Sequence, residues 1–411
     1  MLQVSPEILL EILEMLAIPL AFQAHEFPDR AALASCSLVC KSWSALSQQM
    51  LFQRVSIEDH WTGMLFMRGP TIDRLASFLS TITADTNKSR WLRESVRSII
   101  LRLPSSSHIV DLLTHLPNLR ELDIVGAACT FSEAELAQLQ RSSSGSLRSL
   151  RVNTDYTGSI TSFGAPAWPA VMKLVSAIPT IRMLDITTNT VQQLTLHVPP
   201  LQLQLVSAKI SSQRIADAGP FLVSMGHHPL EIFHQTKSLL DADLEGILST
   251  HGGHLRSLSL QGPVSDVHAL ASCTHLERFE CRTVPTEALM AAVPRTITAL
   301  CVHHPVTPTI QPVNLYGAVP SARVARMANG RQLPKPPVPL IPLRKPLTHL
   351  IQQLETLPRL RVFTWVGSPM HPEFDALKVR CTTLGIEFRV RATNSVSPEL
   401  DRGLASNGFY S

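Results

Sequence analysis

A six-residue phrase, apolar-x-x-apolar-x-apolar, recurs along this chain of 411 residues. Alternation of apolar and polar positions is typical of a strand that buries one face. Several copies follow a helical pattern and a break, as in HIVDLLTHLPN before residue 119 and LIQQLETLPR before residue 360. The pattern therefore predicts that helix, turn and strand alternate. The copies that we interpret as strands begin at residues 52, 96, 119, 147, 181, 255, 276, 297 and 360.

The spacing of these copies indicates a repeat array. The copies at 255, 276 and 297 lie 21 residues apart, and the match VQQLTL at 191 follows its predecessor so closely that we interpret it as chance. The period resembles that of degenerate leucine-rich repeats. This resemblance implies an α/β fold, an irregular leucine-rich-repeat solenoid with one parallel sheet and helices outside. No unit can cover its apolar face alone, so neighbouring units must stack.

In each phrase the apolar positions are expected to point into the core, and the intervening positions to line the concave face of the sheet. Charges on that face alternate in sign instead of forming a basic stripe, which favours a protein ligand over a phosphate backbone. The alternative is that most of them are solvated strand positions. The candidate substrate-binding residues are Glu121, Asp123, Arg151, Asp185, Arg278, Glu280, Arg282 and His303, beside the polar Ser257, Ser259 and Thr364.

The first 57 residues carry a different, purely helical pattern. Ser5, Pro6 and Glu7 form a helix start, with a capping hydroxyl, proline at the first position and an acid at the positive end of the helix dipole. Further apolar residues recur at helical spacing after Asp29. A unit this small buries little apolar area by itself, so its apolar surface needs the rest of the chain or a partner.

The segments VSPEILLEILEML and LASCSLVCKSWSALSQQMLFQRVSI resemble the F-box, a small all-α module of ubiquitin-ligase substrate receptors. The resemblance implies docking on a Skp-type adaptor and, through it, on a cullin. The departures from the family pattern are Val4-Ser5-Pro6 at the start and a long loop, residues 17–30. The same apolar residues could instead form intramolecular core. The residues that the resemblance implies for adaptor binding are Pro6, Ile8, Leu9, Ile12, Leu38, Val39 and Trp43.

Residues 303–346 contain ten of the 30 prolines, six Lys or Arg and no acidic residue. Proline removes backbone donors and disfavours helix in the preceding residue, so this segment is expected to be an inserted loop or polyproline stretch. Residues 331–344 include two PxxP cores with flanking cations, a form that SH3-type partners accept. The last twenty residues are expected to be a disordered tail.

Charge and composition narrow the class of protein further. The net charge is +4, but residues 1–58 carry three basic and six acidic side chains while residues 303–346 carry six basic ones, so the rest is near neutral. We therefore expect no nucleic-acid groove. No apolar run approaches the roughly 18 residues of a spanning helix, so no membrane span is expected. Glu7, Glu11 and Glu14 disfavour a signal peptide, and seven cysteines without a CxxC pair indicate buried, reduced thiols and a cytoplasmic or nuclear protein.

No catalytic motif stands out: the chain has no GxSxG, phosphate-binding glycine loop or HExxH. The histidine clusters are His227-His228, His251-Gly-Gly-His254 and Cys301-Val-His303-His304. They lie at expected helix or strand ends, where histidine is ordinarily a surface residue, and zinc needs four well-placed ligands. We therefore expect no metal, no cofactor and no enzyme activity. Cys40 is expected inside the apolar helical core, where a reactive thiolate is disfavoured.

These patterns divide the chain into an F-box-like helical module (1–57), a solenoid (58–302), the proline-rich insertion (303–346), final repeats (347–391) and a tail (392–411). The expected function is that of a substrate receptor in a Skp-cullin-F-box type ubiquitin ligase. The alternative is a leucine-rich-repeat scaffold outside the ubiquitin system, whose N-terminal helices only cap the solenoid.

Overall fold

The centre of the molecule is one sheet of twelve parallel strands, β1 to β12, arranged in chain order. The structure is a computed structural model, which describes residues 5, 8–9, 12–13, 30–57, 74–102, 104–125, 130–142, 146–153, 168–188, 205–212, 229–235, 241–261, 267–304, 347–367, 369 and 371–391. The strands are β1 Arg54–Ile57, β2 Ser98–Arg102, β3 Glu121–Val125, β4 Ser149–Asn153, β5 Met183–Thr188, β6 Ser207–Ser212, β7 Ile232–Gln235, β8 Ser257–Leu260, β9 Arg278–Cys281, β10 Ala299–His303, β11 Val362–Val366 and β12 Glu387–Arg391.

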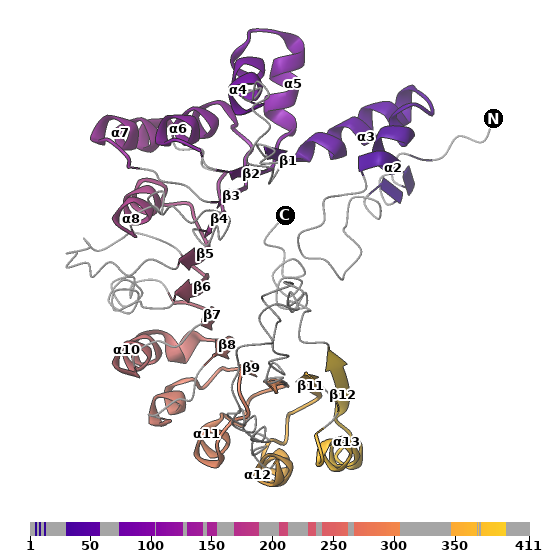
Figure 1. Cartoon of the computed structure of the whole chain (residues 1–411), viewed down its shortest axis with the longest axis vertical. Helices are drawn as coiled ribbons and strands as arrows, with labels where there is room; N and C mark the ends of the chain where they lie inside the picture. Colours follow the sequence, from indigo (N-terminus) through magenta and orange to yellow (C-terminus); the bar gives the residue numbers. More distant parts are fainter. Residues whose placement is uncertain are drawn as a thin grey trace, which may run out of the picture.

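Figure 1 shows the strands on the inner side of an arc and the helices from α4 onward on its outer side. The helices are α2 Arg30–Ser37, α3 Lys41–Gln53, α4 Arg74–Thr83, α5 Asn87–Ser95, α6 Ser106–His115, α7 Glu133–Ser142, α8 Trp168–Ala177, α10 Asp241–His251, α11 Glu287–Ala292, α12 Thr348–Gln353 and α13 Phe374–Thr383. Short 3₁₀ turns are η1 Gly252–His254, η2 His268–Ser272 and η4 Leu354–Thr356. The order of strand, helix and parallel strand is that of a leucine-rich-repeat-like solenoid, as the periodicity predicted.

The recurring phrase forms strands because each copy supplies a buried face. In β3, Leu122 and Ile124 are buried while the residues on either side of them are half-buried, and β2, β4 and β10 show the same alternation. The inward side chains join one continuous core that runs from Ile57 to Ile386. All nine predicted strands are present, and because their apolar residues share a core with the helices, the intervening residues face the opposite, concave side of the sheet.

The sequence pattern missed three strands, β6, β7 and β12. In β7 the third inward position is Gln235, a polar residue that is nevertheless buried. In β6 the second apolar position of the phrase is Ala208. Alanine is small and therefore a weak hydrophobic signal, although Ala208 is buried. Strand β12 ends the sheet, and its Val390 is half exposed because no further strand follows it among the described residues.

The helices α6, α8, α10 and α12 match the helical patterns that precede their strands. Other helices, such as α7 and α11, begin at local capping residues that the periodicity did not reveal. Thr286 accepts a hydrogen bond from the Leu289 backbone N–H at 3.2 Å and so caps α11. Ser132 and Glu135 cap α7 reciprocally, because the Glu135 side chain accepts the Ser132 N–H at 2.8 Å.

The N-terminal helical module, here the described residues up to Gln53, has a small core of its own. Its buried members are Leu9, Leu13, Leu33 and Met50. Helix α3 runs directly into β1, and the Phe52 ring meets Trp91 of α5 edge to face at a centroid distance of 5.7 Å. The module therefore has a separate hydrophobic cluster but is continuous with the first repeats of the solenoid.

Several expectations fall on residues outside the described ranges. These include most of the proline-rich insertion (305–346), the PxxP segment 331–344 and the tail 392–411. Of the described helices, none combines the length and the apolar character that a membrane span requires.

Candidate functional site

The concave face carries one unbroken row of side chains, because the parallel pairing holds equivalent positions in register. We call this the central row. Neighbouring members are paired by strand register, as in Asp123 with Arg151 and Arg151 with Asp185. In chain order its members are Ser56, Ile100, Asp123, Arg151, Asp185, Lys209, His234, Ser259, Glu280, Cys301, Thr364 and Arg389.

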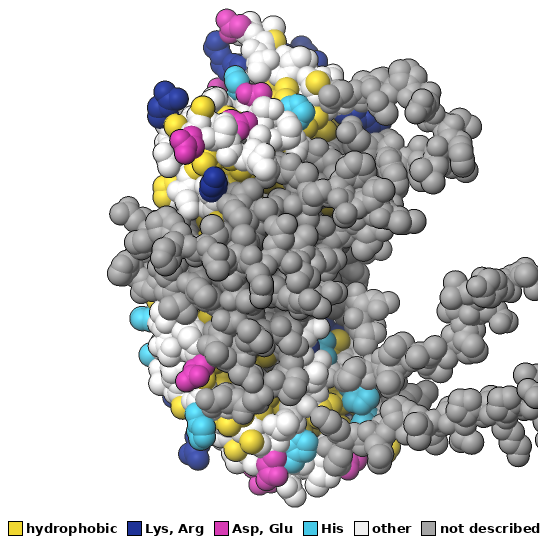
Figure 2. Space-filling model, turned by 60° about the vertical axis from the view of Figure 1, so that its left-hand side comes forward, with side chains coloured by type: hydrophobic (Ala, Val, Ile, Leu, Met, Phe, Trp, Pro, Cys, Tyr) yellow, Lys and Arg dark blue, Asp and Glu magenta, His cyan; other side chains and the backbone are white. Residues whose placement is uncertain are grey.

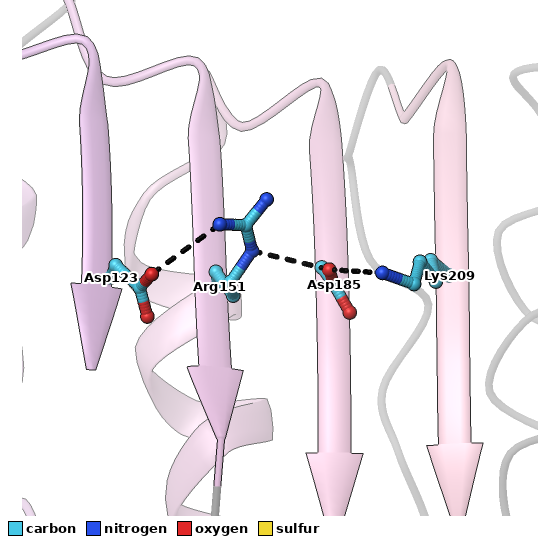
Figure 3. A network of polar contacts seen from close by, with 4 residues as sticks. All are labelled: Asp123, Arg151, Asp185 and Lys209. Carbon is cyan, nitrogen blue, oxygen red and sulfur yellow. Dashed lines mark hydrogen bonds and ion pairs between the residues drawn. The ribbon is translucent and has the colours of Figure 1, made fainter. Parts of the chain in front are cut away.

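Four members of the central row form a ladder of alternating charge across β3 to β6 (Figure 3). Arg151 stands between two carboxylates, with its Nη1 3.4 Å from Asp123 Oδ2 and its Nε 3.2 Å from Asp185 Oδ2. Lys209 Nζ lies 3.0 Å from the same Asp185 oxygen. The sequence predicted three of these residues as site members but not Lys209, which lies on the missed strand β6.

This charge ladder contributes little to stability. Its cations are roughly 40% exposed and its carboxylates 17%, so each pair contributes at most about 1 kcal/mol. The second oxygen of Asp185, Oδ1, is buried and makes no hydrogen bond. The ladder therefore presents fixed charges of both signs together with an unused acceptor.

A second cluster of polar side chains lies at β9 and β10. It consists of Glu280, Arg282 and His303, and we call it the Glu280 group. The imidazole Nε2 of His303 is 2.8 Å from Glu280 Oε1, and Arg282 Nε is 3.3 Å from that same oxygen. Glu280 is buried. Burial alone would raise its pKa, but the His303 hydrogen bond and the positive charge of Arg282 outweigh that effect and hold the pKa below its usual range. Glu280 is therefore a buried, ionised carboxylate.

His234, another member of the central row that the sequence did not single out, lies on the missed strand β7. Its Nε2 is buried and makes no hydrogen bond. Burial, which Lys209 and Arg282 reinforce by charge, lowers the pKa of His234 to about 4 against the opposing effect of Glu280 and Asp185. The imidazole is therefore neutral at physiological pH.

The remaining predicted site residues lie on a second row, two residues nearer the strand starts. Glu121 is half-buried and Arg278 is exposed there. Of the polar neighbours, Ser257 is buried in this second row, whereas Ser259 and Thr364 are buried in the central row. The structure thus divides the eight candidates between the charge ladder, the Glu280 group and the second row.

The sequence analysis also missed a series of arginines just before the strands. The backbone N–H groups of Arg120, Arg148 and Arg182 each bond the carbonyl of the preceding arginine in the series, beginning with Arg97. The signal was present, since arginine follows the first apolar residue in most copies of the phrase. Burial and the charge of Arg120 lower the pKa of Arg97, whose Nη1 also donates to the Glu94 carbonyl at 2.8 Å. These arginines connect successive loops by backbone hydrogen bonds, and their side chains add positive charge.

The helical module leaves several large apolar side chains in solvent. Leu38 is 86% exposed, Val39 62% and Ile8 54%. Of the other residues implied for adaptor binding, Leu9 belongs to the small core, Ile12 is half-buried and Trp43 packs against that core. Pro6 lies outside the described residues.

Two expectations about single residues were wrong. Cys40 is exposed, because it occupies the N-cap position of α3 in an extended conformation and not the helical core. His251 is buried rather than a surface residue, and its Nδ1 accepts the Leu230 N–H at 3.5 Å. In both cases the position relative to a helix end, and not the local sequence, decided the exposure.

The fold assignment depends on the sheet itself, since the comparisons with known proteins add little. No family model matches the chain, and no curated protein matches its sequence. Among solved structures the chain is similar to a leucine-rich-repeat protein of Leptospira interrogans, with 10% identity over 78% of this chain and 67% of that one and a TM-score of 0.28. The twelve parallel strands with outer helices define a leucine-rich-repeat-like solenoid.

Proposed function

We propose that this chain is a non-enzymatic substrate receptor of a Skp-cullin-F-box type ubiquitin ligase. The observation that carries the proposal is the exposure of Leu38 and Val39, which form the turn between α2 and α3. The core of the described part of the module consists of four other buried residues, and these two side chains are not part of it. Large exposed apolar side chains beside a filled core indicate a surface for a partner.

The concave face supports the other half of the proposal. Its charge ladder alternates in sign across β3 to β6, which suits a protein substrate with complementary charges and not a phosphate backbone (Figure 3). On the outer face, acidic and basic side chains are also interspersed over the upper helices (Figure 2). The receptor would raise the effective concentration of its substrate near the ubiquitin donor, and the chemistry would take place on the partner.

A pull-down with a purified Skp-type adaptor tests the adaptor half. The wild-type chain should be retained, whereas Leu38→Asp with Val39→Asp should lose binding at least tenfold, because two charges would be placed in an apolar contact. The matched control is Val379→Asp on α13, since Val379 is similarly exposed at 65% but lies at the other end of the solenoid. Circular dichroism should show that all three proteins are folded.

The receptor proposal fails if the folded wild-type chain does not bind the adaptor, or if the double variant binds as tightly as the control. Neither result would affect the solenoid assignment, which depends on the sheet. A positive result would justify searching for the substrate among proteins that accumulate when residues 1–53 are deleted.

The alternative function, a scaffold whose N-terminal helices cap the solenoid, is favoured by the junction between α3 and the first repeats. The Arg97 N–H donates to the Gln53 carbonyl at 2.8 Å, and Phe52 packs on Trp91. Terminal repeats of a solenoid need a cover on their open end. This junction uses Phe52 and its neighbours at the end of α3, whereas Leu38 and Val39 lie before the start of that helix.

A further inference from the structure

We propose that Glu280, Cys301 and His303 form a binding site for a zinc-like transition-metal ion on the concave face. Cys301 and His303 are alternate residues of β10, so both project from the same face of the strand. Parallel pairing places Glu280 of β9 directly beside Cys301. The carboxylate, thiol and imidazole ligand atoms of the three residues all lie within 4.8 Å of one another.

The geometry is close to what a tetrahedral ion requires. Zinc bonds of 2.0 to 2.3 Å imply ligand atoms about 3.3 to 3.7 Å apart. The Glu280 Oε1 and His303 Nε2 atoms are 2.8 Å apart, so this pair would widen slightly to admit an ion while Cys301 turns inward. On metal binding, His303 Nε2 would exchange its contact with Oε1 for the metal, while Arg282 could keep its ion pair with Oε1 if Oε2 is the ligand.

The chemistry of the three ligands selects the class of metal. Thiolate and imidazole are ligands of zinc and related transition metals, whereas calcium and magnesium prefer oxygen alone. Binding would release the Cys301 thiol proton to solvent, so that thiolate and carboxylate together balance the charge of a divalent ion. Three protein ligands leave a fourth position for water.

Unsatisfied polar atoms nearby provide a second observation. Ser259 Oγ and His234 Nε2 are buried without a hydrogen-bond partner. Ser259 is the register neighbour of Glu280 on β8, and His234 is the register neighbour of Ser259. Buried polar atoms normally have partners, so this concentration around Glu280 indicates that a polar ligand, such as an ion with its bound water, belongs there.

The test uses the purified full-length chain, stripped with a chelator and titrated with Co²⁺, which reports thiolate ligation by a charge-transfer absorption. The wild type should bind one equivalent and show this absorption, and Zn²⁺ should displace the cobalt. Cys301→Ser should abolish the absorption, and His303→Gln should weaken binding at least about tenfold, because each removes a ligand. Circular dichroism checks that both variants fold.

Matched controls come from exposed residues elsewhere, Cys40→Ser and His254→Gln, which should bind cobalt like the wild type. The proposal is overturned if the wild type binds no stoichiometric cobalt, or if Cys301→Ser keeps the full charge-transfer absorption. It is also overturned if His303→Gln binds as tightly as the wild type. These outcomes are independent of adaptor binding, because Leu38 and Val39 lie in the helical module.

Discussion

The ion pairs and the ionisation of central-row side chains depend on the neighbouring strands. Asp185 holds two cations only because β4 and β6 flank β5. Glu280 remains ionised although it is buried, since a histidine from β10 and an arginine just beyond β9 both contact it. His234 has two cations and two carboxylates within electrostatic range and is neutral, because burial dominates. A residue's ionisation in this solenoid is thus a property of three or more repeats.

Asp185→Asn should lower the free energy of unfolding by about 1 kcal/mol, because the ladder loses the charge that holds Arg151 and Lys209. The two cations are roughly 40% exposed, so salt should screen the effect. Urea unfolding at low salt and at 1 M salt measures it. An effect of equal size at both salt concentrations would show that the loss is not electrostatic.

His234 should make the protein less stable in acid. Its pKa is about 4 in the folded chain and about 6.5 when unfolded. Between these values the unfolded state binds the extra proton, so the free energy of unfolding falls as pH drops from 6.5 to 4, by at most about 3 kcal/mol. Above pH 6.5 the contribution is unchanged.

The measurement is the free energy of unfolding against pH, in the presence of a chelator, for the wild type and His234→Gln. The variant cannot take up the proton and should show a shallower decline between pH 6.5 and 4. Parallel curves for the two proteins over this range would contradict the assignment.

At the scale of elements, several repeats combine a strand that has an inward apolar face with a helix that begins at a local cap, as in α5, α6, α7 and α11. The strand is specified by apolar residues, while the helix start is specified by one hydroxyl or carboxylate. In α11, which is only six residues long, the Thr286 hydroxyl satisfies a backbone donor that would otherwise lack a partner within the helix.

Thr286→Ala should therefore lower the free energy of unfolding by about 1 kcal/mol, because the Leu289 N–H loses its acceptor. Thr286→Ser keeps the hydroxyl and is the matched control, with little expected change. Chemical denaturation of the three proteins measures the difference. Equal stabilities for the alanine and serine variants would contradict the capping role.

At the scale of the whole molecule, the described residues form two hydrophobic clusters, a small one in the helical module and a long one that follows the sheet. A solenoid repeat contacts mainly its neighbours, so local damage should stay local. The contact between Phe52 and Trp91 joins the helical module to the first repeats, at one end of the array.

Leu33→Ala removes a fully buried side chain from the small cluster and should cost about 2 to 5 kcal/mol there. Hydrogen exchange should then show lost protection in residues 30–53 but not in β8 to β11. Leu258→Ala, in the long cluster, is the matched control and should show the opposite pattern. Uniform loss of protection in both variants would mean that the chain unfolds as a single unit.

The sequence by itself determined the architecture of repeats and the direction in which most strand residues point. Three apolar positions in each copy of the phrase must be buried together, so stacking follows from the hydrophobic effect alone. The periodicity did not predict strands whose apolar pattern is weaker, and β7 shows the reason. Gln235 is polar yet buried, because its register neighbour on β6, Ile210, belongs to the core and Gln235 takes the equivalent inward position.

Only the tertiary structure decided which polar residues meet. Glu280 precedes Cys301 by a full repeat, and nothing local in the sequence fixes the register that places them side by side. Lys209 completes the charge ladder from a strand that the pattern did not reveal. The physical reason is that hydrophobic periodicity specifies which face is buried, whereas ligand sets and ion pairs depend on the alignment of residues across strands.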